Sequence, residues 1–162
     1  MQTSNRGAEQ PKRLPLSAKK VEEGVWFHGS AGTLAGLLTD IGTAFLHEFG
    51  PEPDATSAPT PLELFCHANN AQALLVNWLE LLLYVLETRQ AVLEDLEVHL
   101  DKMSLTATCR CLSLLGAHWE IPRALDARSA RVVETDEGLW EADVQVRLRQ
   151  AQPELQDADA DA

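Results

Sequence analysis

The sequence predicts an α+β fold, a two-layer sandwich in which two helices pack on one face of a mostly antiparallel sheet. Three observations lead to this prediction. Two segments place apolar residues at the three- and four-residue spacing of a helix. Several other segments alternate apolar and polar residues, as strands with one wet face do. Short polar joins at 101–102 and 136–138 predict hairpins, and hairpins imply antiparallel pairing.

The first predicted helix runs over 33–49, where Gly50 and Pro51 end it. The second runs from about Asn70 to Thr88, with Asn69 or Asn70 as its cap. Its apolar face is so broad that a soluble monomer would not leave it exposed. We therefore expect this helix to be buried against the sheet.

The predicted strands are 23–28, 62–67, 93–100, 105–112, 130–135 and 140–149. In the last one, one face is apolar and the other is polar, the polar side chains being Glu141, Asp143, Gln145, Arg147 and Arg149. The stretch from Gly50 to Pro61 contains four prolines, so it is expected to be a surface connection.

The 162 residues are enough for one domain, which we place at 19–149. Residues 1–18 read as a disordered basic N-terminal segment, and residues 150–162 as a disordered acidic tail. The formal net charge is −12, which disfavours direct nucleic acid binding by the folded part, because an acidic surface repels phosphates. Neither a membrane span nor a secretory signal is expected, so the predicted location is cytoplasmic.

Three cysteines are too few for a disulfide framework. Cys109 and Cys111 point to the same face of a strand and, with Cys66 and His67, are a candidate zinc site, but the spacing favours buried apolar side chains instead. The run 29–32, Gly-Ser-Ala-Gly, precedes a helix and suits either an anion site or a simple strand-to-helix turn, the second being commoner.

The block 73–98, ALLVNWLELLLYVLETRQAVLEDLEV, resembles the signature of the archease family, in which a Leu-rich helix with a central Trp-Leu-Glu passes into a strand. Upstream, GVWFHGSAGTLAGLLTDIGTAFL is similar to the family's first strand, turn and helix. Downstream, LTATCRC, His118 and the closing VVETDEGLWEADVQVRL resemble its C-terminal half. The resemblance covers roughly residues 19–149.

This resemblance implies a non-enzymatic accessory protein of the GTP-dependent tRNA-splicing RNA ligase, acting in tRNA splicing or RNA repair. Such proteins promote guanylylation of the ligase and its multiple turnover, so the implied partner is an RNA-splicing ligase. The family also binds a divalent metal, calcium or magnesium, through two Asp residues. Glu22 stands at the first of these positions and keeps a carboxylate. Arg147 stands at the second, and a guanidinium has no lone pair to offer a metal.

Two interpretations of Glu22 and Arg147 remain open: an ion pair in place of the metal, or two solvated side chains on wet faces. Two alternative functions also remain open. One is an archease-fold protein-interaction module without ligase role or metal. The other is a small enzyme that uses Glu22, His28 or His118 as acid or base.

Overall fold

The structure is a computed structural model that describes residues 16–21, 24–51, 58–113, 124–126 and 130–149. It contains two helices, α1 (Leu34–Phe49) and α2 (Ala71–Arg89). The strands are β1 (Ser17–Val21), β2 (Gly24–Ala31), β3 (Thr60–His67), β4 (Ala91–Asp101), β5 (Ser104–Ser113), β6 (Ala124–Asp126), β7 (Arg131–Glu134) and β8 (Trp140–Arg149).

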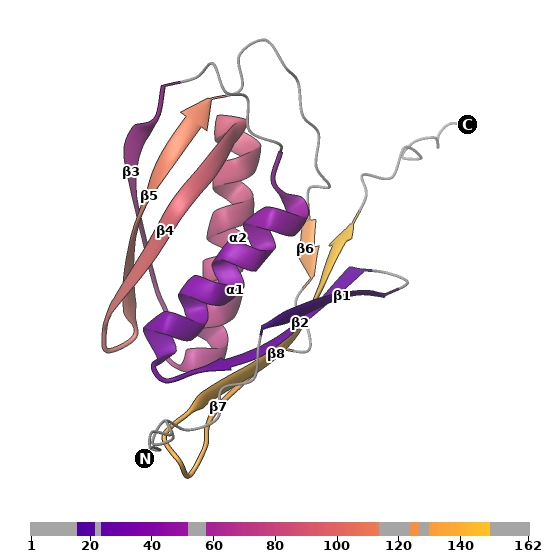
Figure 1. The fold of residues 1–162 in the computed structure, drawn as a ribbon, viewed down its shortest axis with the longest axis vertical. Helices are drawn as coiled ribbons and strands as arrows, with labels where there is room; N and C mark the ends of the chain where they lie inside the picture. The colour runs from indigo at the N-terminus through magenta and orange to yellow at the C-terminus, as the bar shows by residue number, and fades with distance from the viewer. Residues whose placement is uncertain (1–15, 22–23, 52–57, 114–123, 127–129, 150–162) are drawn as a thin grey trace, which may run out of the picture.

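The strands form two sheets, and every strand pair is antiparallel. The larger sheet has the order β1-β2-β8, with β6 and β7 both pairing with β8. The smaller sheet has the order β3-β5-β4. Figure 1 shows the two sheets on different sides of the helices.

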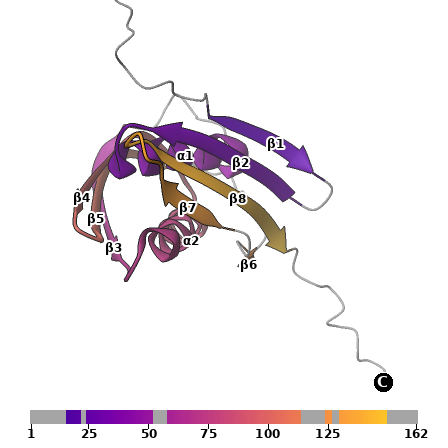
Figure 2. The same cartoon turned by 90° about the horizontal axis from the view of Figure 1, so that it is seen from below.

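The helices occupy the angle between the sheets (Figure 2). α1 contacts β4 on one side and β2 and β8 on the other, while α2 contacts β3, β4 and β7. The α+β class, the two helices and the antiparallel pairing are confirmed. The strands, however, divide into two sheets instead of one, because apolar alternation identifies the buried face of a strand but not its neighbour.

Both helices begin at side-chain caps. Thr33 Oγ1 accepts a hydrogen bond of 2.9 Å from the backbone N–H of Gly36 at the start of α1. Asn70 Oδ1 accepts one of 2.8 Å from the N–H of Ala73 at the start of α2. The side chain of Thr33 thus occupies the first turn of α1 after Gly32, which favours the strand-to-helix turn over an anion site.

The core lies between the helices and both sheets. Its largest fully buried side chains include Trp78 of α2, Phe27 of β2 and Phe45 of α1. By length and a hydropathy of 1.2, α2 is apolar enough to cross a membrane. Eight of its side chains are nevertheless buried in this fold, as in the core helix of a globular domain.

Four features differ from the expected strands. β1 starts at Ser17, two residues before the predicted domain boundary, and β6 was not expected. β3 begins at Thr60 and so includes Pro61, which an edge strand tolerates. β4 carries a bulge between Glu94 and Glu97. The predicted tail at 150–162 and most of the predicted N-terminal segment lie outside the described residues.

Candidate functional site

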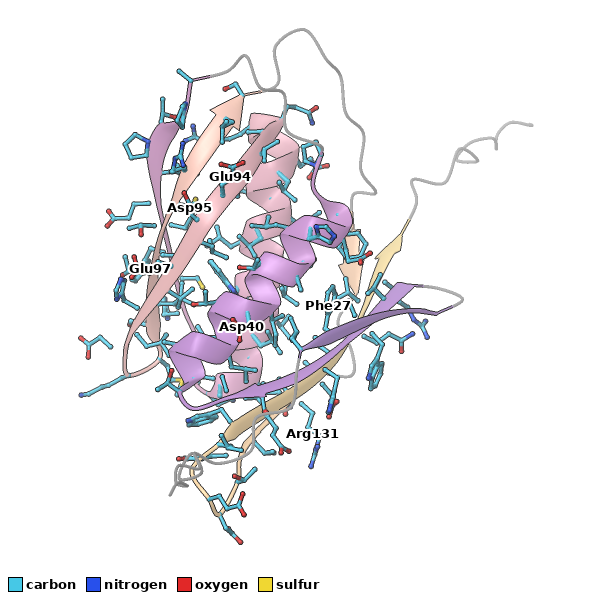
Figure 3. The ribbon with its side chains drawn as sticks, viewed as in Figure 1. Phe27, Asp40, Glu94, Asp95, Glu97 and Arg131 are labelled. Carbon is cyan, nitrogen blue, oxygen red and sulfur yellow. The ribbon has the colours of Figure 1, made fainter. Side chains whose placement is uncertain are left out.

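A row of polar residues crosses the outer face of the larger sheet. The strand register places His28 of β2 opposite Asp143 of β8, and Asp143 opposite Arg131 of β7. Nδ1 of His28 contacts Oδ1 of Asp143, and Nη1 of Arg131 lies 3.5 Å from Oδ2 of the same carboxylate. In Figure 3 Arg131 lies on the outer side of this sheet, and Phe27 lies on the side of the helices.

This row orients an imidazole on an open surface. The side chain of Asp143 is 23% exposed and that of His28 is 38% exposed. In neutral His28, the contact with the carboxylate selects the form that carries its proton on Nδ1 and leaves Nε2 as the acceptor. The row therefore combines an oriented imidazole with a guanidinium that faces the same carboxylate.

Arg147 lies farther along the same outer face of β8. Val146 pairs with Val25, so Arg147 follows at the level of Gly24, and its register partner on β6 is Asp126. A Cβ atom at Gly24 would come within 2.0 Å of the carbonyl oxygen of Val146, so glycine allows β2 to approach β8 here. The predicted wet face of β8 is confirmed by the burial of Ala142, Val144 and Val146 on its other side.

The described residues do not fit a divalent metal site. Among them, no group of three or more His, Cys, Asp or Glu side chains is arranged to hold a metal ion. Arg147 occupies the position at which the resemblance places a carboxylate ligand, and it cannot donate a lone pair. Glu22 lies outside the described residues, as does His118, so their predicted roles remain predictions.

The cysteines belong to the core. Cys109 and Cys111 are 5% and 6% exposed, and all three cysteines are free thiols. Burial raises the pKa of Cys109 from 9.0 to about 11, and the neighbouring Cys111 adds to this shift. Burial also raises the pKa of Cys66. These shifts favour the neutral thiol. The expected burial of Cys109 and Cys111 is confirmed, and no group of three or more possible metal ligands forms among the described residues.

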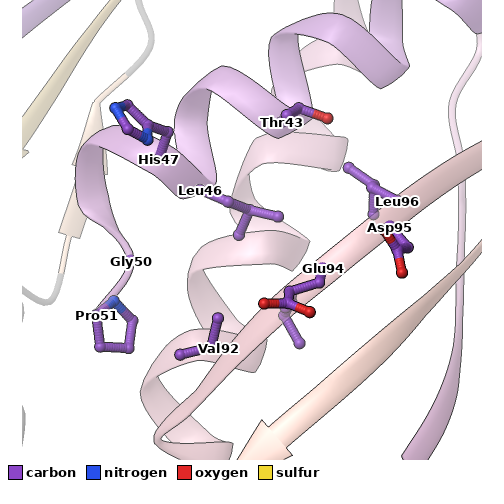
Figure 4. Close-up of a pocket in the computed structure, with 10 residues that line it drawn as sticks. Thr43, Leu46, His47, Gly50, Pro51, Val92, Glu94, Asp95 and Leu96 are labelled. Atoms are coloured by element: carbon purple, nitrogen blue, oxygen red, sulfur yellow. The ribbon is translucent and has the colours of Figure 1, made fainter. Parts of the chain in front are cut away.

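A pocket of about 350 Å³ opens between the C-terminal part of α1 and the bulged part of β4 (Figure 4). Its walls combine apolar side chains such as Leu46 and Leu96 with the ionisable groups of His47 and Glu94. Asp95, at the bulge, has a φ of 56° and accepts a hydrogen bond of 2.9 Å from Nη1 of Arg110. The bulged part of β4 forms one wall of this pocket. The sequence does not predict the bulge, and it therefore does not predict the pocket.

Comparisons with known proteins identify the family. The sequence model of the archease protein family matches residues 25–147. The chain belongs to the archease family. The match includes both helices, the smaller sheet and most of the larger sheet, in which β1 precedes it, and it contains His28, Asp143 and Arg147.

A solved structure has the archease fold seen here. The solution structure of Methanobacterium thermoautotrophicum protein 1598 superposes with a TM-score of 0.54 at 14% sequence identity. The match covers 82% of this chain and 98% of that one. At this identity the likeness concerns the fold alone. A search of curated proteins finds no match to this archease-family chain.

The sequence predicts a strand that ends at His28 and places Arg147 on the polar face of another strand, but it does not predict what surrounds His28. Asp143 is predicted on the polar face of its strand, and the sequence does not single out Arg131. This row depends on the pairing of β2 and β7 with opposite edges of β8, which the sequence does not predict. Only that register brings the three side chains into one row.

Proposed function

We propose that this archease-family protein is a non-enzymatic accessory factor that activates a GTP-dependent tRNA-splicing RNA ligase. In this proposal it promotes guanylylation of the ligase, and thereby multiple turnover, in tRNA splicing or RNA repair. The observation that carries the proposal is the family match over residues 25–147. Membership of this family points to a role associated with an RNA ligase and to activation in preference to catalysis.

The charge of the chain supports a protein partner. A net charge of −12 repels RNA, whereas a ligase that binds RNA needs a basic surface. Opposite charges accelerate the encounter of two proteins, and this effect weakens as salt is added. We therefore expect a salt-sensitive association with the ligase and no direct contribution of this chain to RNA affinity.

The proposed activation of the ligase does not use a metal ion bound by this chain. We propose that the cation of Arg147 takes the place of the calcium or magnesium ion that the family resemblance implies, with Glu22 as its opposite charge. We also propose a cytoplasmic location, which three free thiols fit, because reducing compartments keep cysteines unpaired.

The test is RNA joining by the ligase from the same source, with the ligase limiting and GTP present. The substrates are RNA ends with a 3′-phosphate and a 5′-hydroxyl, and this protein is added in substoichiometric amounts. We expect ligation to pass beyond one round per ligase only when the protein is present. Unchanged ligation, together with no association between the two proteins, would overturn the proposal.

A second candidate function is a protein-interaction module that keeps the fold without the ligase role. The observation that favours it is Arg147 at a position where the family resemblance expects a metal ligand. This candidate predicts that the protein, captured from its own cell extract, brings down a partner other than the ligase.

A further inference from the structure

The outer face of the smaller sheet is not covered by either helix. α1 and α2 contact this sheet on the side where Leu64, Ala107 and Val98 are buried. The alternate residues of its strands point away from the helices. We define the acidic sheet face as the outward residues Glu63, Phe65, Thr106, Thr108, Glu97 and His99.

An exposed aromatic ring lies on this face. Phe65 is 61% exposed and is one of two large hydrophobic residues that are exposed in the described part of the chain, the other being Tyr84. It lies on the edge strand β3, with the ring of His67 6.1 Å away. Aromatic residues of this kind are typical anchors at the centre of protein interfaces, where burial gives them most of their binding energy.

Carboxylates outnumber basic side chains on the three strands of this sheet. The three strands carry Glu63, Glu94, Asp95, Glu97 and Asp101 but only one Arg or Lys residue, Arg110. The guanidinium of Arg110 is bonded to Asp95. Figure 3 shows Glu94, Asp95 and Glu97 following one another along β4. Two carboxylates of the acidic sheet face, Glu63 and Glu97, lie in the register row next to that of Phe65, so the apolar ring has acidic neighbours.

The negative charge of the acidic sheet face indicates which kind of molecule can bind there. A second copy of the chain would bring the same carboxylates against these, which is unfavourable. RNA and anionic lipid surfaces are repelled for the same reason. A protein with basic side chains around an apolar socket complements both features of the face.

We propose that the acidic sheet face is the docking surface for a basic protein partner, with Phe65 as its anchor. This inference rests on the proposed function, in which the partner is the RNA ligase. Three strands of 8, 11 and 10 residues cover on the order of 400 to 500 Å². A standard interface buries about 800 Å² on each partner, so this face accounts for the centre of an interface or for a weak, transient one.

The experiment measures the affinity of the full-length protein for the ligase by calorimetry at low and moderate salt. The test variants are Phe65→Ala and the double variant Glu63→Lys/Glu97→Lys. The matched controls are Tyr84→Ala and Glu80→Lys, which change an equally exposed aromatic residue and a carboxylate on α2. Thermal unfolding verifies that all variants fold, which we expect because every substituted side chain is exposed.

We expect the test variants to weaken binding by at least about tenfold, or about 1.4 kcal/mol, and the controls by less than about twofold. The effect of charge reversal should shrink as salt is added, whereas that of Phe65→Ala should persist. Equal binding by wild type and test variants would overturn this docking face and leave the proposed function intact. A wild-type protein that neither binds nor stimulates the ligase would overturn both. If the wild type self-associates and Phe65→Ala abolishes this self-association, the acidic sheet face binds a second copy of the chain and the proposed basic partner is wrong.

Discussion

The indole of Trp78 lies directly against Gly42, where α2 crosses α1. A Cβ atom at Gly42 would come within 2.9 Å of the indole Nε1 and within 2.8 Å of Cδ2 of Leu96. The same Nε1 donates a buried hydrogen bond of 2.9 Å to the carbonyl oxygen of Leu38. The glycine that weakens α1 as an isolated helix is thus what allows the two helices and β4 to pack together.

Replacing Gly42 by Ala should destabilise the protein. Overpacking a well-packed core costs about 1 to 3 kcal/mol, which outweighs the roughly 1 kcal/mol that alanine gains in a helix. The free energy of unfolding in urea measures the difference. The control is Gly32→Ala, because a Cβ there meets nothing within 4 Å among the described residues. A Gly42→Ala protein as stable as the control would contradict this packing.

Trp78→Phe should also lower stability, for a different reason. Phenylalanine keeps most of the apolar surface but has no donor for the carbonyl of Leu38. The lost hydrogen bond and the smaller ring together cost about 1 to 3 kcal/mol of stability. Urea unfolding again gives the value. A loss below about 0.5 kcal/mol would mean that the hydrogen bond contributes nothing measurable.

Stability should fall in the alkaline range because of Cys109. Its folded pKa of about 11 lies above the ordinary 9.0, so the folded state holds a proton that the unfolded state releases. This contribution is fully present below pH 9 and is lost as pH rises toward 11. The contribution of Cys109 is measured by comparing the unfolding free energies of the wild type and Cys109→Ala across that pH range. Two curves that stay parallel would show that Cys109 keeps an ordinary pKa in the fold.

Neutral His28 should carry its proton on Nδ1, because that atom faces the carboxylate of Asp143. The ¹⁵N chemical shifts of the imidazole ring distinguish the two neutral forms. Asp143→Ala should remove the preference, and Arg131→Ala should keep it, since Arg131 contacts the carboxylate and not the ring. A proton found on Nε2 in the wild type would contradict the oriented imidazole.

Arg147→Asp should create affinity for a divalent cation. The substitution restores a second carboxylate at the position that the archease resemblance assigns to a metal ligand, with Glu22 as the first. A site with so few charged ligands should bind Ca²⁺ with a dissociation constant on the order of 10⁻⁴ to 10⁻³ M, which calorimetry can measure. The variant Glu22→Gln/Arg147→Asp serves as the control and should not bind. If Arg147→Asp gains no affinity, these positions do not derive from a metal site.

The local elements of the fold were predictable because their signals are local. Thr33 and Asn70 cap the helices within one residue of the predicted starts, and the turn at Gly138, with a φ of 87°, lies in the predicted join before β8. β1 and β6 were missed for a physical reason: they are short, and β1 begins within a segment whose polar residues and proline read as disordered.

The candidate site was less predictable because it depends on contacts between distant strands. His28 and Asp143 are 115 residues apart, and each alone is only a polar residue on a wet strand face. Likewise, the bulge that inserts an extra residue into β4 sets the shape of the pocket beside Glu94, yet the strand alternates almost as a regular one would.

We propose that this protein increases the guanylylation of an RNA ligase. The most direct measurement follows the transfer of radiolabelled GMP from GTP to a ligase that has just completed one round of RNA joining, with and without this protein. We predict that labelled ligase accumulates faster when the protein is present, and that excess salt reduces the gain. Identical labelling rates in both samples, at protein concentrations that saturate any association, would show that this protein does not promote guanylylation.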